Sequence, residues 1–295
     1  MGTFPGLKNP VYITPTQVKR IIGTTASAVN DDDLLLRFCE ETSRRIDKYC
    51  NRFFYPRYQE LKTNWPGTSF DLRLPFDLIN VVTLTNGDGN VILPTNLTTG
   101  NANYFLYEQD SYPRWKLQLS IISGIVFLFV STPQQAISIK ALWGYPASEY
   151  DGSWKTDSAA TVQNGTSQNA TIKTLQVQTG YFNAGDTVYI DDEFEIVQSV
   201  SVLTPSSNFD TLTVSRGSAG STAAVHLNGT TIYLVEYHPE IFHAAERLTA
   251  WAYRLKDSQQ FQDIGVSSMG VISLPKGMPV DCADILRDFV RGHRK

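Results

Sequence analysis

Two stretches of the sequence hold residue types used in catalysis, but neither has the spacing that the chemistry requires. A serine nucleophile on a sharp turn needs Gly-x-Ser-x-Gly, and residues 265–270, Gly-Val-Ser-Ser-Met-Gly, miss that pattern. A phosphate-binding loop needs Lys followed by Ser or Thr at a helix start, and residues 216–222, Arg-Gly-Ser-Ala-Gly-Ser-Thr, contain no Lys. The second stretch is typical of a turn between strands. We therefore expect a protein that is not an enzyme and binds no cofactor.

Metal-ligating residue types are present, but their spacing does not indicate a metal site. The sequence has four histidines and three cysteines: His226, His238, His243, His293, Cys39, Cys50 and Cys282. The histidines do not form ligand pairs, and no Cys-x-x-Cys occurs. Acidic runs at 31–33 and 191–193 lack the alternating oxygen ligands and the glycine of a calcium loop. We interpret the acidic runs as a helix start and a turn, and the cysteines as buried thiols in a reducing compartment.

Composition excludes some classes of protein. The net charge of −4 over 295 residues argues against a broad basic surface for nucleic acid. The longest apolar run, residues 121–130, is too short to cross a bilayer as a helix, so we expect no membrane association. Its β-branched and aromatic residues predict a buried strand. The first six residues have neither a charged nor an apolar segment, and we expect no secretory signal.

Helical periodicity is strongest in residues 31–50. Apolar side chains recur there on one stripe: Leu35, Phe38, Cys39, Thr42, Ile46, Tyr49 and Cys50. A similar stripe follows Pro239, and shorter helices are predicted after Thr14 and from about 279 to 291. Thr14 and Gln17 have the spacing of a capping box.

Period-two patterns indicate two groups of strands. The first group falls at 58–62, 69–74, 81–86, 104–108, 116–119, 125–129 and 136–143. The second falls at 170–178, 187–190, 194–203, 212–215 and 231–235, where charges are sparse and turn residues frequent.

These patterns predict an α+β fold. In it, a small core of long amphipathic helices packs with antiparallel strands, and an all-β barrel or sandwich is inserted. The helical domain would be discontinuous, with residues 1–148 and 237–295, and the β-domain would span 149–236.

Two sets of charged residues are candidates for contacts with other proteins. Glu40, Glu41, Arg44 and Arg45 lie on the polar side of the predicted helix, where they could form ion pairs within the helix or between subunits. Arg291, His293, Arg294 and Lys295 make a basic C-terminus. That terminus either complements a helix dipole or docks on an acidic partner.

The order of several motifs resembles the head–tail connector (adaptor, or head-completion) proteins of tailed bacteriophages. The first motif is residues 33–53, a helix that ends in Tyr-Cys-Asn-Arg-Phe. Leu-Pro-Phe-Asp-Leu-Ile-Asn-Val follows at 74–81, and a strand ending in Trp-Gly-Tyr-Pro at 139–146. A helix that begins Pro-Glu-Ile-Phe-His-Ala-Ala at 239 and a short terminal helix at 279–291 complete the pattern. Small members of the family have only a short loop in place of the β-domain.

The resemblance implies a structural role in the virion. Such proteins form a ring, typically of twelve copies, beneath the portal protein at the head–tail junction. The ring extends the channel for double-stranded DNA and offers a surface to a neck or tail-completion protein. The four charged helix residues are then the candidate subunit interface, and the basic C-terminus is the candidate portal-docking segment. Assembly would take place in the host cytoplasm.

Two other functions stay open at this point. The β-domain resembles small modules of phage structural proteins through its turn at 216–226, Arg-Gly-Ser-Ala-Gly-Ser-Thr-Ala-Ala-Val-His. It could therefore belong to another virion component, such as a tail-completion protein or a surface-exposed adhesin. An enzyme with an unrecognised site is the remaining alternative, suggested only by the aromatic-rich strands and by Trp154, for which the sequence offers no packing partner.

Overall fold

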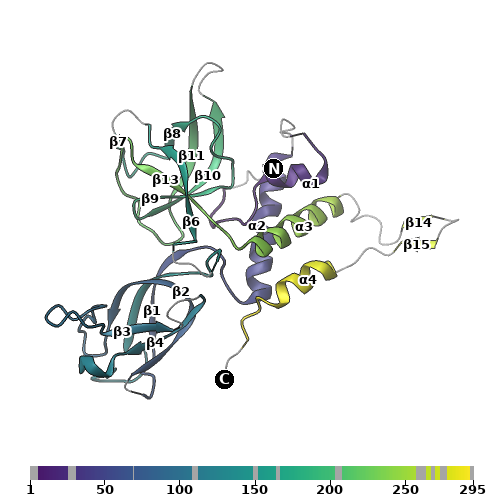
Figure 1. The fold of residues 1–295 in the computed structure, drawn as a ribbon. Helices are drawn as coiled ribbons and strands as arrows, with labels where there is room; N and C mark the ends of the chain where they lie inside the picture. Colours follow the sequence, from purple (N-terminus) through teal and green to yellow (C-terminus); the bar gives the residue numbers. More distant parts are fainter. Residues whose placement is uncertain are drawn as a thin grey trace.

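Two antiparallel β-sheets make up most of the structure, and a group of helices lies beside them (Figure 1). The computed structural model describes residues 6–25, 31–68, 70–107, 112–148, 152–163, 167–202, 208–256, 264–266, 270–272 and 278–292.

The predicted fold class, an α+β fold built around a core of long helices, is wrong. Among the described residues, helices of 8, 19, 17 and 8 residues accompany sheets of five and six strands. Each sheet buries an apolar cluster of its own, so the strands do not need the helices as a core. The chain is therefore mostly β.

The first sheet has the strand order β1-β5-β2-β4-β3. Its strands are β1 (Arg57–Thr63), β2 (Asp71–Thr85), β3 (Tyr104–Tyr107), β4 (Arg114–Leu119) and β5 (Ile137–Trp143). The segments predicted as separate strands at 69–74 and 81–86 form one long strand, β2. Its register shifts against both neighbours, so β2 pairs with β4 along its first half and with β5 along its second.

The second sheet has the strand order β6-β13-β9-β10-β11-β8. Its strands are β6 (Lys155–Thr161), β8 (Thr174–Gln178), β9 (Thr187–Ile190), β10 (Glu193–Val202), β11 (Phe209–Ser218) and β13 (Thr231–Val235). The edge strands approach each other, because the Gln163 N–H donates to the Gln176 carbonyl at 2.8 Å. The sheet thereby curls toward a small barrel, flanked by β7 (Ser167–Gln168) and β12 (His226–Leu227). All these strands fall inside residues 149–236, and the predicted domain boundaries stay a prediction.

The helices are α1 (Pro15–Ile22), α2 (Asp32–Cys50), α3 (Pro239–Leu255) and α4 (Val280–Arg287). The predicted capping box of α1 is confirmed, with Thr14 and Gln17 bonding each other's backbone N–H groups. The helices contact one another and share an apolar cluster that includes all three cysteines as buried free thiols. Between α3 and α4, β14 (Ile264–Val266) pairs with β15 (Gly270–Ile272). No described helix has both the length and the apolar character needed to cross a membrane.

A shared aromatic cluster joins the two sheets. Trp154, which the sequence left unexplained, is buried with its ring centroid 4.9 Å from that of Tyr189 and 5.9 Å from that of Phe194. Ile79 and Leu142 of the first sheet complete the cluster. Trp154 is therefore a packing residue between the barrel and the first sheet.

Candidate functional site

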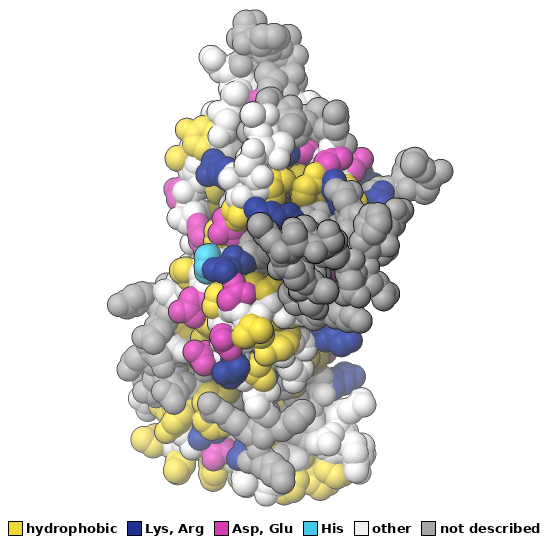
Figure 2. Space-filling model, turned by 90° about the vertical axis from the view of Figure 1, so that its right-hand side faces the viewer, with side chains coloured by type: hydrophobic (Ala, Val, Ile, Leu, Met, Phe, Trp, Pro, Cys, Tyr) yellow, Lys and Arg dark blue, Asp and Glu magenta, His cyan; other side chains and the backbone are white. Residues whose placement is uncertain are grey.

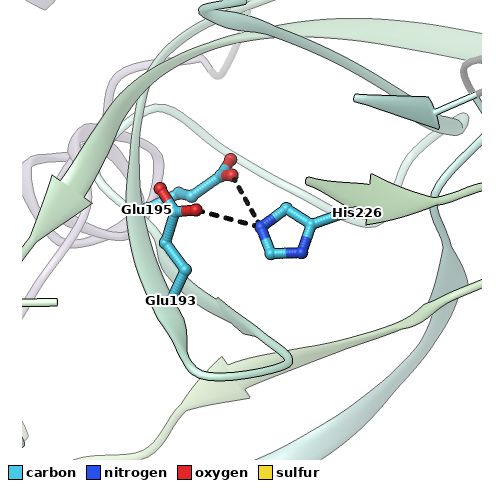
Figure 3. A group of neighbouring side chains, drawn as sticks. All are labelled: Glu193, Glu195 and His226. Carbon is cyan, nitrogen blue, oxygen red and sulfur yellow. Dashed lines mark hydrogen bonds and ion pairs between the residues drawn. The ribbon is translucent and has the colours of Figure 1, made fainter. Parts of the chain in front are cut away.

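A group of buried charged side chains lies inside the barrel. Glu193 and Glu195 alternate on β10 and therefore face the same side of the strand. Arg216 comes from β11 and His226 from β12. The His226 Nε2 lies 3.0 Å from a Glu193 oxygen and 3.6 Å from a Glu195 oxygen (Figure 3). We call these four residues the barrel charge cluster.

Glu193 is the most heavily bonded member of the cluster. Arg216 donates to both of its carboxylate oxygens, at 2.8 and 2.7 Å, and the backbone N–H groups of Gly217 and Ala224 each donate at 2.7 Å. Burial by itself raises the pKa of Glu193, but these bonds and the contact with His226 together lower it to about 2. The carboxylate is therefore ionised at neutral pH.

Glu195 and His226 are the titratable members of the cluster. Burial raises the pKa of Glu195 to about 7, although Arg216 lies 2.8 Å away. Burial acts to lower the pKa of His226, but its hydrogen bonds with Glu193 and with Asp191, at 2.8 Å, raise it above the ordinary value. Both groups therefore hold a proton more firmly than they would in water.

The cluster has the residue types of a metal site. One ligand atom each from Glu193, Glu195 and His226 lies within 4.8 Å of the others. The guanidinium of Arg216, however, already ion-pairs with both carboxylates. Because a cation of the chain itself neutralises the acids, we assign the cluster a structural role rather than metal binding.

The cluster fixes the glycine-rich turn that connects the barrel to the first sheet. The Ala219 carbonyl accepts a hydrogen bond of 2.8 Å from the Tyr58 N–H of β1. At Gly220, with φ +76°, a Cβ atom would lie 2.0 Å from the Tyr58 carbonyl oxygen. Only glycine allows this close approach. The sequence indicated this turn, and Glu193 only as part of the acidic run at 191–193, but it gave no indication of Glu195. Two acids at alternate positions, each followed by an apolar residue of β10, were the available signal.

The predicted subunit interface on α2 is partly used within the chain. Arg44 donates to the Pro10 carbonyl at 2.7 Å and ion-pairs with Asp47 at 3.3 Å. Arg45 lies over the Trp251 ring, with 5.8 Å between its guanidinium carbon and the ring centroid. Glu41 is exposed and Glu40 half-buried on the same helix. The two arginines of this set therefore have contacts within the chain, and the interface stays a prediction.

The predicted docking segment is described only at its start. The Arg291 N–H donates to the Cys50 carbonyl at 2.8 Å, and its guanidinium donates to the Leu74 carbonyl at 3.0 Å. These bonds attach Arg291 both to α2 and to β2. His293, Arg294 and Lys295 lie outside the described residues.

A patch of exposed apolar side chains lies on two loops of the first sheet, residues 86–103 and 120–136. We name it the loop patch, and its most exposed members are Leu97 (86%), Ile121 (78%), Ile122 (83%) and Val130 (75%). The prediction of a buried strand here is wrong, because Ile121–Ser123 form a 3₁₀ turn and the following residues form no strand. Figure 1 shows these loops on the side of the sheet away from the helices. Figure 2 looks at the molecule from the side of the helices, where hydrophobic side chains lie scattered among charged ones.

The two loops hold each other in place. The Asn86 side chain donates to the Val126 carbonyl at 2.9 Å and accepts from the Leu128 N–H at 3.2 Å. The Ser120 N–H donates to the Asn103 carbonyl at 2.8 Å. Residues 89–103 and 120–136 contain no charged side chain. The loop patch is therefore a braced, uncharged surface with an unusual exposure of aliphatic groups.

Comparisons with family models, with curated proteins and with solved structures find no match to this chain.

Proposed function

We propose that this protein is a structural component of a phage virion, a connector that assembles as a ring beneath the portal and continues the DNA channel. The loop patch carries the proposal. Four aliphatic side chains exposed by three quarters or more, on the charge-free segments 89–103 and 120–136, favour burial against another protein. The kind of assembly, a connector ring, is inferred from the order of the sequence motifs, which resembles that of the connector family.

Ring closure requires two different surfaces on each subunit, because every copy must contact its neighbours head to tail. The loop patch is one such surface. Glu40 and Glu41 on α2 offer a second, polar surface on another part of the molecule. The net charge of −4 suits a channel through which DNA slides, since strong phosphate attraction would slow its passage.

Native mass spectrometry of the chain mixed with its portal tests the proposal. We expect a ring of many copies with the parent protein, and no ring with the double variant Ile121→Asp, Ile122→Asp. The control is Val225→Asp, Val280→Asp, which changes two exposed aliphatic side chains elsewhere. The control should assemble like the parent.

Circular dichroism of each variant confirms that the fold is retained. A parent chain that stays monomeric in the presence of the portal would refute the proposal. Assembly of the Ile121, Ile122 variant at the parent level would refute the role of the loop patch.

A further inference from the structure

Three adjoining hollows form one continuous trough where the helices meet the two sheets. Their volumes are about 490, 470 and 760 Å³. The first and second share Asn9, Tyr55 and Arg57 in their walls, and the second and third share Asn51, Arg52 and Phe76. The trough therefore crosses from the glycine-rich turn of the barrel to residues 290–292, which follow α4.

The trough is basic, although the whole chain is acidic. Lys8, Lys48 and Arg73 line it as exposed cations. Among the described residues of its walls, Asp288 is the one exposed acid. This surplus of positive charge contrasts with a net charge of −4 for the protein. A locally positive electrostatic potential on a protein with a negative net charge indicates a site for an anionic partner.

The two other acids in the trough walls are buried and already neutralised. Asp47 has 8% of its side chain exposed and lies 3.3 Å from Arg44, and Asp77 has 5% exposed and lies 3.4 Å from Arg52. These acids therefore do not compensate the exposed cations.

Aromatic rings hold the trough's guanidinium groups in fixed positions. The Arg57 guanidinium carbon lies 3.7 Å from the Phe53 ring centroid, and that of Arg44 lies 4.8 Å from the Tyr55 centroid. Stacked in this way, the guanidinium groups are preorganised for carboxylate or phosphate oxygens. The same stacking covers the ring faces, which reduces the surface on which nucleic-acid bases could stack.

We propose that this trough binds an extended acidic segment of a partner protein. Arg52 has only 13% of its side chain exposed, so a ligand must reach into the recess to meet it. Single carboxylate side chains on an extended chain can do so. A DNA duplex is stiff and carries its phosphates on a broad surface, so it fits a recessed trough less closely than an extended peptide does. That the partner is a neighbour in the virion rests on the proposed function.

Fluorescence anisotropy with a labelled peptide of alternating Glu and Ser, about a dozen residues long, tests the proposal on the full-length monomer. The test variant is Lys48→Glu, Arg73→Glu, and the control is Lys140→Glu, Lys173→Glu. The control residues are exposed, lie outside the trough walls and give the same change in net charge. We expect the test variant to bind the peptide at least about tenfold more weakly than the control.

Equal affinity of the two variants, or no binding by the parent, would overturn the proposal. Single-stranded and duplex DNA of matched length are measured beside the peptide. If either DNA binds more tightly than the peptide, and the Lys48, Arg73 variant loses this binding, the trough is a nucleic-acid site and the proposal is overturned. Ring formation is measured separately, so a chain that binds the peptide but forms no ring refutes the connector role and leaves the trough assignment standing.

Discussion

Thr42 of α2 and Thr249 of α3 share a hydrogen bond of 2.6 Å between their side-chain oxygens, although 207 residues separate them in the sequence. Both side chains are buried, and Thr42 also contacts the Phe38 carbonyl at 2.7 Å. The bond marks the place where the first and last parts of the chain pack together. It gives the first of four predictions.

Replacing Thr42 by valine should leave the buried Thr249 hydroxyl without this partner, whereas the Thr42 hydroxyl keeps the Phe38 carbonyl when Thr249 is replaced. We expect Thr42→Val to lower the free energy of unfolding by about 1–3 kcal/mol. The double variant Thr42→Val, Thr249→Val should lose less than the sum of the single variants, because the remaining orphan group is removed as well. Urea unfolding of all four proteins measures this coupling. Strictly additive losses would show that the two hydroxyls do not interact.

The barrel charge cluster should be sensitive to loss of its cation. Arg216→Met leaves Glu193 buried with no cationic side chain at its carboxylate apart from His226. We expect a loss of about 3–5 kcal/mol, since an uncompensated buried charge is costly. Adding Glu193→Gln should recover part of the loss. Thermal unfolding measures the stability of the parent, of Arg216→Met and of the double variant. An Arg216→Met protein as stable as the parent would contradict the assigned structural role.

The stability of the protein should depend on pH through Glu195. Its pKa is about 7 in the folded protein and 4.5 ordinarily, so between these values the folded state holds more protons than the unfolded state. The free energy of unfolding should therefore fall by about 3 kcal/mol as pH rises from about 4.5 to about 7. His226, whose pKa is also raised, contributes stability at low pH that is lost as pH rises through its folded pKa.

Glu195→Gln removes the carboxyl group from this titration and should flatten the pH profile. Urea unfolding of parent and variant at several pH values measures the difference. Identical slopes in the two proteins would mean that Glu195 does not titrate as a buried acid.

The turn that joins the barrel to the first sheet should not tolerate a side chain at Gly220. A Cβ atom there would overlap the Tyr58 carbonyl oxygen, so Gly220→Ala must displace the turn from β1. We expect faster hydrogen exchange at the Tyr58 amide, which donates to Ala219 in the parent. Gly229→Ala is the control, because Gly229 also has a positive φ of +87° but nothing within 4 Å.

The control should lose only about 1–2 kcal/mol from backbone strain and leave Tyr58 protected. Equal exchange at Tyr58 in both variants would show that the turn does not depend on close contact with β1.

Local patterns predicted the helices well because a helix satisfies its backbone within a few residues. The boundaries of α2 at Asp32 and Cys50 lie within one residue of the prediction, and the Thr14–Gln17 cap is confirmed. The balance of helix and sheet was harder to predict. β6 was missed altogether, since its sequence Lys-Thr-Asp-Ser-Ala-Ala-Thr has no alternation of apolar and polar residues. The predicted helical core gave way to two sheets with their own cores.

The sequence by itself determined which segments are helical, where their caps lie and that the three cysteines are buried, because these properties follow from spacing along the chain. Only the tertiary structure decided which way an apolar run faces. Residues 121–130 have the composition of a buried strand, yet Ile121 and Ile122 are exposed because no strand covers their loop. The tertiary structure also brought His226 to Glu193, 33 residues away, through pairing between strands that leaves no local trace in the sequence.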